Sequence, residues 1–299
     1  MAQIREIKRR IRSINNTKKI TRAMELVSAA KMRKAVQAVL ATRPYANLSW
    51  EMIKNLSSKT DPVHHPLLKK RKKIRKIGII LISSNRGLCA GFNREIIERT
   101  VHYIRRHTEV ETEIILIGKK GRAIMYKHGQ KIVAEFTKNE LISEISEAAP
   151  IARMAIEDYL AKKYDRIILA YTDFVSSLSQ KPRLRKLLPI EEEDELLGYV
   201  GEKAPKENLA LEFAEYLFEP SPDYVLEQMI WRLIEMQIYQ ALLESTASVQ
   251  AARMMAMNKA TQAASDLVSD LDFFFNQARQ ADITKDLSEI SASRAVLES

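Results

Sequence analysis

The amino-acid sequence predicts an α/β protein in which two long terminal helices pair as an antiparallel coiled coil around an inserted α/β domain. The placement of glycine and proline is the first observation behind this prediction. All eight glycines lie between Gly78 and Gly201, and residues 223–299 contain neither glycine nor proline. Because these residues interrupt helices and form turns, their absence allows long continuous helices. The second observation is that the middle of the chain alternates apolar runs with amphipathic segments, which is typical of α/β proteins.

The N-terminal helix is expected over residues 1–60. Isoleucines at alternating spacings of three and four residues form the seam of a coiled coil: Ile4, Ile7, Ile11 and Ile14. We expect the register to slip at residues 15–17 and to resume with Ile20, Met24 and Val27. The segment 61–66 contains two prolines and is expected to end the helix.

The inserted domain is expected over residues 74–200. Its first strand is a continuous apolar run, which indicates a parallel strand buried on both faces. The expected strands are Lys76–Ser83, Glu113–Ile117, Lys131–Phe136, Arg166–Tyr171 and Arg183–Ile190. The expected helices are Phe92–His107, Lys119–His128 and Asn139–Lys163.

The C-terminal helix is expected over residues 221–295, beginning near Asp223 as its N-cap. Its expected seam consists of Ala260, Ala264, Leu267, Leu271, Phe274, Ala278 and Ala281. At ~1.5 Å per residue such a helix is roughly 110 Å long. The N-terminal helix is shorter, so part of the C-terminal helix must be covered by another protein.

Positive charge is concentrated in two places, within a net charge of +10. Residues 1–34 contain eleven lysines and arginines against two glutamates, and a second basic run covers residues 69–76. Such charge indicates an acidic partner, which can be nucleic acid, anionic lipid or an acidic protein surface. A solvated helix face is an equally simple interpretation. No aromatic residue precedes Tyr45, so the basic helix has no platform for stacking bases.

No catalytic, cofactor-binding or metal-binding residues are predicted. The segment Gly87–Gly91 has two glycines four residues apart and no lysine at the phosphate position, unlike a dinucleotide-binding fingerprint. An enzyme with a nucleotide at this segment is nevertheless a rival hypothesis. The five histidines lack the spacing of metal ligands. The single cysteine, Cys89, excludes an intrachain disulfide, and we expect it to be a small buried residue.

Four segments, in the same order, resemble the γ subunit of F-type ATP synthases. They are residues 14–34, 84–93, 251–257 and 276–284. The resemblance runs from about Ile4 to Ile290. It implies that the inserted domain is Rossmann-like and that the coiled coil stands within a ring of alternating α and β subunits.

The resemblance also implies a function and a set of partners. The chain would be a non-catalytic rotor shaft that transmits rotation of the membrane c ring to the catalytic β subunits, for ATP synthesis coupled to proton transport. Its partners would be the α, β, δ and ε subunits and the c ring, with no cofactor, small-molecule substrate or nucleic acid. It would lie peripherally at the cytoplasmic face of the bacterial plasma (inner) membrane. The alternative from charge alone is a nucleic-acid-binding coiled coil.

Contact residues carry over from the family position by position. Those that match contacts with the α/β ring are Arg22, Met24, Arg253, Arg279, Gln280, Thr284 and Glu289. Those that match contacts with the c ring and the ε subunit are Tyr216, Phe218 and Glu219. The alternative is structural: Met24 packs the coil, and Arg279 and Gln280 orient the helices. The family commonly has glycine where Ala90 stands, which we expect to be a minor change in packing.

Overall fold

The computed structural model describes residues 2–59, 66–69, 71, 73–139, 144–190, 219 and 221–297. The chain divides into two units, Met1–Ser28 with Met254–Ser299, and Ala29–Arg253. Helix α1 (Ala2–Lys59) and helix α5 (Pro222–Leu297) each contribute to both units. Helix α1 continues through Pro44. The turn segment 61–66 lies outside the described residues except for Pro66.

The larger unit contains a five-stranded sheet with the strand order β3-β2-β1-β4-β5. The strands are β1 (Lys76–Ile82), β2 (Glu111–Ile117), β3 (Lys131–Phe136), β4 (Arg166–Phe174) and β5 (Gln180–Leu188). Strands β1 to β4 are parallel, and β5 is antiparallel to β4 at one edge. The five predicted strands are therefore confirmed. The chain reverses its direction of winding between β1 and β4, as in Rossmann-like sheets.

The helices of this unit are α2 (Phe92–Arg106), α3 (Lys120–Lys127), the 3₁₀ turn η2 (Ile145–Glu147) and α4 (Ala149–Leu160). The prediction of one helix over Asn139–Lys163 was wrong at both ends. Asn139 is not helical, and α4 starts ten residues later with Pro150 in its first turn, where the missing N–H of proline costs nothing. Beyond α4, Lys162 has a φ of 60°, which is incompatible with a continuing helix.

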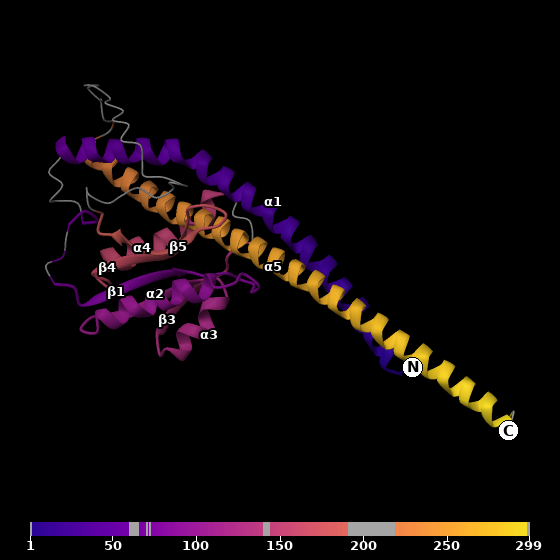
Figure 1. The fold of residues 1–299 in the computed structure, drawn as a ribbon. Coiled ribbons are helices and arrows are strands. Elements are labelled where there is room, and N and C mark those ends of the chain that lie inside the picture. Colours follow the sequence, from indigo (N-terminus) through magenta and orange to yellow (C-terminus); the bar gives the residue numbers. More distant parts are fainter. Residues whose placement is uncertain are drawn as a thin grey trace. The chain divides into compact units, whose positions relative to one another are not determined.

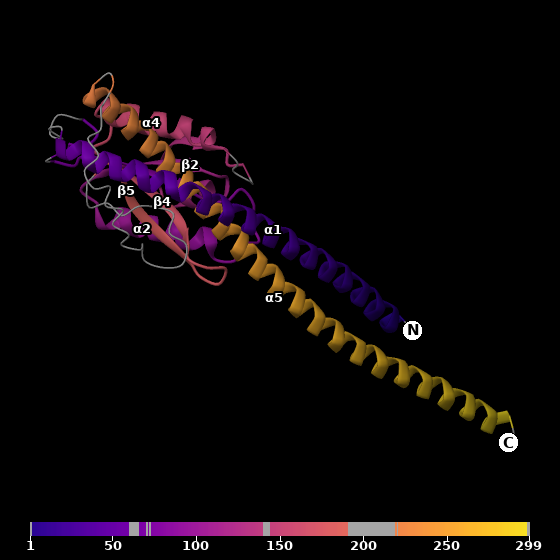
Figure 2. The ribbon, with the colours of Figure 1, turned by 90° about the horizontal axis from the view of Figure 1, so that it is seen from above.

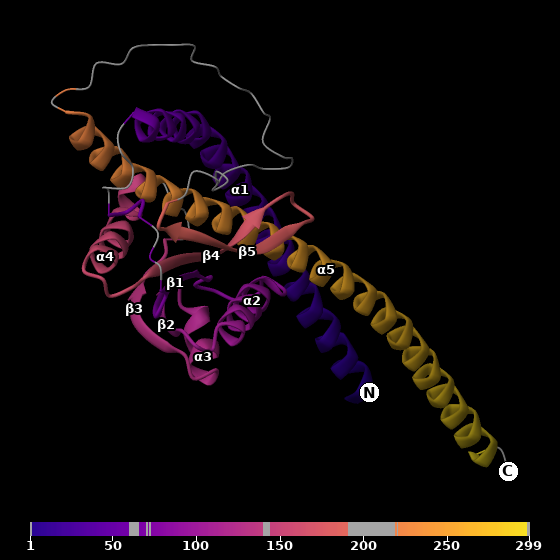
Figure 3. The same ribbon diagram turned by 90° about the vertical axis from the view of Figure 1, so that its left-hand side faces the viewer.

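Alternating side chains of the parallel strands divide the core into two layers, because successive residues of a strand point to opposite faces. On β1, Ile77, Ile79 and Leu81 pack with α2 and α3. Ile80 and Ile82 pack with α4 and with the first turns of α5. Figures 1 and 3 show the sheet between these two layers. The sheet is thus buried on both faces, as its continuous apolar strands predict.

Glycine is required at the loop position Gly118, whereas alanine occupies another position with a positive φ, Ala90. Gly118 follows β2 with a φ of 90°, and an added Cβ would lie 2.3 Å from the carbonyl oxygen of Ser83. Ala90, in the turn before α2, has a φ of 46°. This left-handed conformation is unfavourable for residues with a Cβ. The alanine therefore introduces backbone strain. The expectation that it changes only the packing was wrong.

The smaller unit is an antiparallel coiled coil whose seam becomes polar. Its seam positions on α1 are Ile4, Ile7, Ile11, Ile14, Lys18, Thr21, Glu25 and Ser28, all buried or half-buried. The alternation of three and four residues is unbroken, so the predicted slip at residues 15–17 was wrong. Ile20 and Val27 are instead 60% and 53% exposed. The error arose because the prediction followed the apolar residues, whereas the seam continues through polar ones.

Hydrogen bonds across the polar seam fix the direction and register of the two helices. The Lys18 ammonium donates to Ser265 Oγ at 2.9 Å, and the hydroxyls of Thr21 and Thr261 are 2.8 Å apart. Asn258 Nδ2 donates to Glu25 Oε1 at 3.1 Å. Partners on α5 move backward as α1 advances, which confirms the antiparallel pairing.

The matching seam of α5 consists of Met257, Thr261, Ala264, Val268, Leu271, Phe275, Ala278 and Asp282. The predicted seam positions Ala264, Leu271 and Ala278 are confirmed, and Ala260 is half-buried beside the seam. The positions Leu267, Phe274 and Ala281 were wrongly placed, because all three are exposed. Figure 2 shows that α5 continues past the N-terminal end of α1.

Candidate partner-binding surface

The coiled coil exposes large apolar side chains on both of its helices. They are Ile20, Leu26 and Val27 on α1, and Leu267, Phe273, Phe274, Ile283, Leu287 and Ile290 on α5, each between 50% and 68% exposed. A protein that leaves many large apolar side chains exposed on one coiled coil is expected to bind another protein there. The sequence pattern assigned several of them to the seam, and the unbroken heptad register places them outside it.

Arg22 and Met24 lie on α1 beside the polar seam. Arg22 is exposed, and its guanidinium is 2.7 Å from Glu25 Oε1. Burial raises the pKa of Glu25, but hydrogen bonds from Asn258 and Arg22 outweigh this and lower the pKa. Met24 is half-buried. The structure therefore joins Arg22 to the contact between α1 and α5, while Met24 presents part of its surface outward.

Four predicted contact residues lie on the tip of α5, where every residue from Ile283 to Ser291 is exposed. Arg279 shares a helix face with Ile283, Leu287 and Ile290, because their spacings are four, four and three residues. Gln280 and Thr284 form a neighbouring row. Glu289 lies on another face, 3.8 Å from the ammonium of Lys285. The tip thus combines an apolar row with polar groups on both sides of it.

Arg253 is separate from these positions, because it lies in the larger unit. Its guanidinium donates to Gln250 Oε1 at 3.0 Å. It lines a cavity of about 20 Å³ together with Asn85 and Lys138. Sequence reasoning missed Lys138, which is 8% exposed and whose ammonium has no hydrogen-bond partner among the described residues. No periodic pattern marks a buried lysine in a loop.

This cavity lies at the carboxyl edge of the sheet, the edge where open α/β sheets bind ligands. Helix α5 fills that edge, since Val249 and Ala252 pack against Cys89 and Phe92. Sites for small molecules of drug or cofactor size have volumes of roughly 300–1,000 Å³. The rival hypothesis of a nucleotide at Gly87–Gly91 therefore lacks the space it needs. Cys89 is buried, as predicted.

The predicted contacts with the c ring and ε subunit are only partly described. Tyr216 and Phe218 lie outside the described residues, and Glu219 is exposed shortly before α5. No group of three or more potential metal ligands occurs among the residues that were described. Within the same ranges, no helix is both long and apolar enough to cross a membrane.

Comparison with known proteins gives matches along the whole chain. A family model described as ATP synthase matches residues 3–297. The ATP synthase gamma chain of Alkaliphilus metalliredigens is 41% identical over 294 residues, covering 98% of each chain. That of Herpetosiphon aurantiacus is 40% identical, covering 99% of each chain. That of Pelotomaculum thermopropionicum is 40% identical over the full length of both.

Two solved structures have a similar fold. A chain of the Euglena gracilis mitochondrial ATP synthase has a TM-score of 0.66 and 18% identity, with 99% of this chain and 95% of that chain covered. A chain from the central stalk and c ring of the Tetrahymena thermophila mitochondrial ATP synthase has a TM-score of 0.60 and 24% identity, with 81% and 99% covered. These similarities concern the fold.

Proposed function

This chain belongs to the ATP synthase gamma chain family, and from that membership we infer that it is the central rotor shaft of an F-type ATP synthase. It transmits rotation of the membrane c ring to the catalytic β subunits, so that proton transport drives ATP synthesis. The observation that supports this function best is the coiled coil of α1 and α5. Hydrogen bonds across its seam hold the helices in one register, as a shaft that carries torque requires.

The shaft does not itself catalyse ATP chemistry in this proposal. The usual ligand edge of its sheet is filled by α5, so nucleotides bind to the α and β subunits instead. The chain associates with the α, β, δ and ε subunits and the c ring, and it lies peripherally at the cytoplasmic face of the bacterial plasma membrane. Its full-length relatives from bacteria support this location.

The coil provides the contacts with the α/β ring. The exposed row of Arg279, Ile283, Leu287 and Ile290 turns within the ring, with Gln280, Thr284 and Glu289 beside it. Arg22 and Met24 face the moving segments of β. Arg253, at the C-terminal end of the part of α5 that belongs to the larger unit, also contacts the α/β ring. The segment that contains Tyr216, Phe218 and Glu219 contacts the c ring and the ε subunit.

Co-purification tests the proposal. The chain is tagged in its native host, membranes are solubilised in mild detergent, and the recovered proteins and their ATPase activity are identified. We expect the α and β subunits, with ATPase activity. Recovery of a free chain or of nucleic acid would contradict the rotor function.

Charge reversal distinguishes the rotor from the nucleic-acid alternative, which the similarity to ATP synthase gamma chains does not support. The triple change Arg9→Glu, Arg10→Glu and Arg12→Glu should reduce ATP-driven proton pumping by the complex. The matched control changes the exposed Arg99, Arg105 and Arg106 of α2 to glutamate and should leave pumping near the wild-type rate. Loss of nucleic-acid affinity with unchanged pumping would favour the alternative.

A further inference from the structure

The second basic run of the sequence lines a large pocket that the rotor function does not use. The pocket has a volume of about 880 Å³ and lies where β1 and β2 begin, at the amino edge of the sheet. Its described lining contains seven lysines and arginines against two acidic residues. This volume falls within the range of small-molecule sites, roughly 300–1,000 Å³. The charge excess predicts an anionic occupant.

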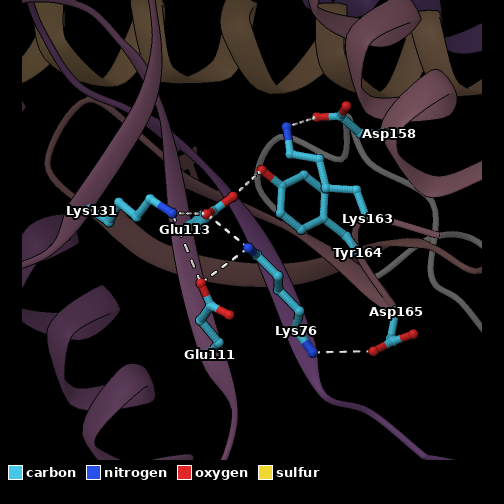
Figure 4. A network of polar contacts seen from close by, with 8 residues as sticks. All are labelled: Lys76, Glu111, Glu113, Lys131, Asp158, Lys163, Tyr164 and Asp165. Atoms are coloured by element: carbon cyan, nitrogen blue, oxygen red, sulfur yellow. Dashed lines mark hydrogen bonds and ion pairs between the residues drawn. The ribbon is translucent and has the colours of Figure 1, made fainter. Parts of the chain in front are cut away.

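Three of the seven cations are neutralised within the protein, as Figure 4 shows in part. Arg71 is 2.9 Å from Asp165 Oδ1. Lys76 lies 3.0 Å from Glu111 and 2.8 Å from Glu113. Lys163 pairs with Asp158 at 2.8 Å. Both acidic residues of the lining, Glu111 and Asp165, are therefore already paired with cations.

Four cations remain: Lys69, Lys73, Arg75 and Lys162. All four are exposed, and none has an ion-pair partner among the described residues. Like charges that converge on one concavity raise the local positive potential, since walls of low dielectric constant focus the field. An anion with several charges relieves that repulsion more effectively than a monovalent one.

The basic run is anchored to the sheet edge. Asp165 Oδ2 accepts the backbone N–H groups of Arg75 at 2.8 Å and Lys76 at 3.1 Å. Arg71 donates to the carbonyl oxygen of Tyr159 at 2.6 Å, and its guanidinium lies 4.6 Å from the centre of the Tyr159 ring. The backbone that carries Lys73 and Arg75 is therefore held in place before a ligand arrives. Such preorganisation reduces the entropy cost of binding.

We propose that this pocket binds a phosphate-bearing polyanion through Lys69, Lys73, Arg75 and Lys162. Arginine recognises phosphate through paired N–H donors, and lysine acts as a compact positive charge. The same phosphate chemistry is offered by a free polyphosphate and by the headgroup of an acidic phospholipid. The proposal does not depend on the rotor function, because it concerns a different edge of the molecule.

The test uses the purified full-length chain and two probes. Inorganic pyrophosphate binding is measured by calorimetry, and binding to phosphatidylcholine vesicles containing phosphatidylglycerol is measured by co-sedimentation, each at low and at physiological salt. The pocket variant carries Lys73→Gln and Arg75→Gln. The matched control carries Arg99→Gln and Lys127→Gln, two exposed cations on α2 and α3 with the same change in net charge.

We expect at least tenfold weaker binding of one probe by the pocket variant and less than twofold weakening by the control. Loss of pyrophosphate binding identifies free phosphate as the source, and loss of vesicle binding alone identifies the lipid headgroup. Equal weakening in both variants would overturn the proposal, because binding would then reflect net charge only. Absence of binding to both probes at low salt would overturn it as well.

Discussion

Lys138 is a buried cation in surroundings that do not neutralise it. Its ammonium has no hydrogen-bond partner among the described residues, and the Asn85 amide donates only to its backbone carbonyl. Arg253, which lines the same small cavity, adds a like charge. Burial, and then the charge of Arg253, lower the pKa of Lys138 to about 7 from its ordinary value of 10.5. Near pH 7 a substantial fraction of the folded molecules therefore has Lys138 without its proton.

The stability of the larger unit should consequently rise with pH above 7. Between about pH 7 and pH 10.5 the unfolded chain keeps the proton that folded Lys138 has released, so raising the pH favours the folded state. Each unit of pKa difference corresponds to about 1.4 kcal/mol, so the total is at most about 5 kcal/mol. Urea unfolding of the wild type and of Lys138→Met, from pH 6.5 to 10, measures this. A stability difference between the two proteins that does not change with pH would contradict it.

Ala90 offers a second prediction at a single residue. Its φ of 46° costs an alanine roughly 1–2 kcal/mol relative to a right-handed conformation, whereas glycine has no such penalty and loses only some chain entropy. The side chain is exposed, so no packing is lost. Ala90→Gly should therefore raise the free energy of unfolding by about 0.5–1 kcal/mol.

The control for this change is Ala123→Gly in α3, where the alanine is exposed and helical. Glycine within a helix should lower the free energy of unfolding by about 1 kcal/mol. The two alanine-to-glycine changes should therefore alter the free energy of unfolding in opposite directions. Measuring both by thermal unfolding isolates the effect of the backbone conformation. Destabilisation by both would show that the turn does not need a left-handed residue.

At the scale of elements, the isoleucines of α1 differ in whether they are buried in the seam of the coiled coil. Ile11 lies in the seam and is half-buried, whereas Ile20 is 60% exposed. Ile11→Ser should lower the free energy of unfolding by about 1–2 kcal/mol through lost apolar burial. Ile20→Ser should change it by less than about 0.5 kcal/mol in the isolated chain. Circular dichroism during thermal unfolding compares the two, and an equal loss would favour a seam through Ile20.

The sequence was sufficient to predict elements whose pattern is strong. The apolar run at Lys76–Ile82 and the glycine-free C-terminal stretch predicted β1 and α5 correctly. The seam could not be followed past Ile14, because Lys18, Thr21 and Glu25 pair by hydrogen bonds that hydrophobicity does not reveal.

Sites formed by distant segments escaped prediction for a related reason. The basic run at residues 69–76 predicted an acidic partner, but nothing in the sequence joins it to Asp165, ninety residues beyond Arg75. Lys138 and Arg253 likewise meet only in the fold. Periodicity reports which face of an element is buried, and it carries no information on which two elements meet.

At the scale of the whole molecule, stability and function should separate along α5. Residues 224–253 of α5 are mostly buried in the larger unit, whereas residues 283–291 are all exposed. Ile283, Leu287 and Ile290 therefore contribute little to the fold of the isolated chain. In the assembled complex their burial should be worth up to about 1.5–3 kcal/mol each, and about 1.4 kcal/mol corresponds to a tenfold change in affinity.

The triple change Ile283→Ser, Leu287→Ser and Ile290→Ser should thus leave the unfolding temperature of the isolated chain within a degree or two, while weakening its association with α and β subunits at least tenfold. Reconstitution of the ATPase from purified subunits at decreasing concentration measures the association. A control that changes the exposed polar residues Gln262, Asp266 and Asp270 to serine should weaken this association less than the apolar triple change does. If the apolar triple assembles normally, the exposed apolar row is not a ring contact, and the contacts of the shaft must instead come from Arg22 and the polar residues of the tip.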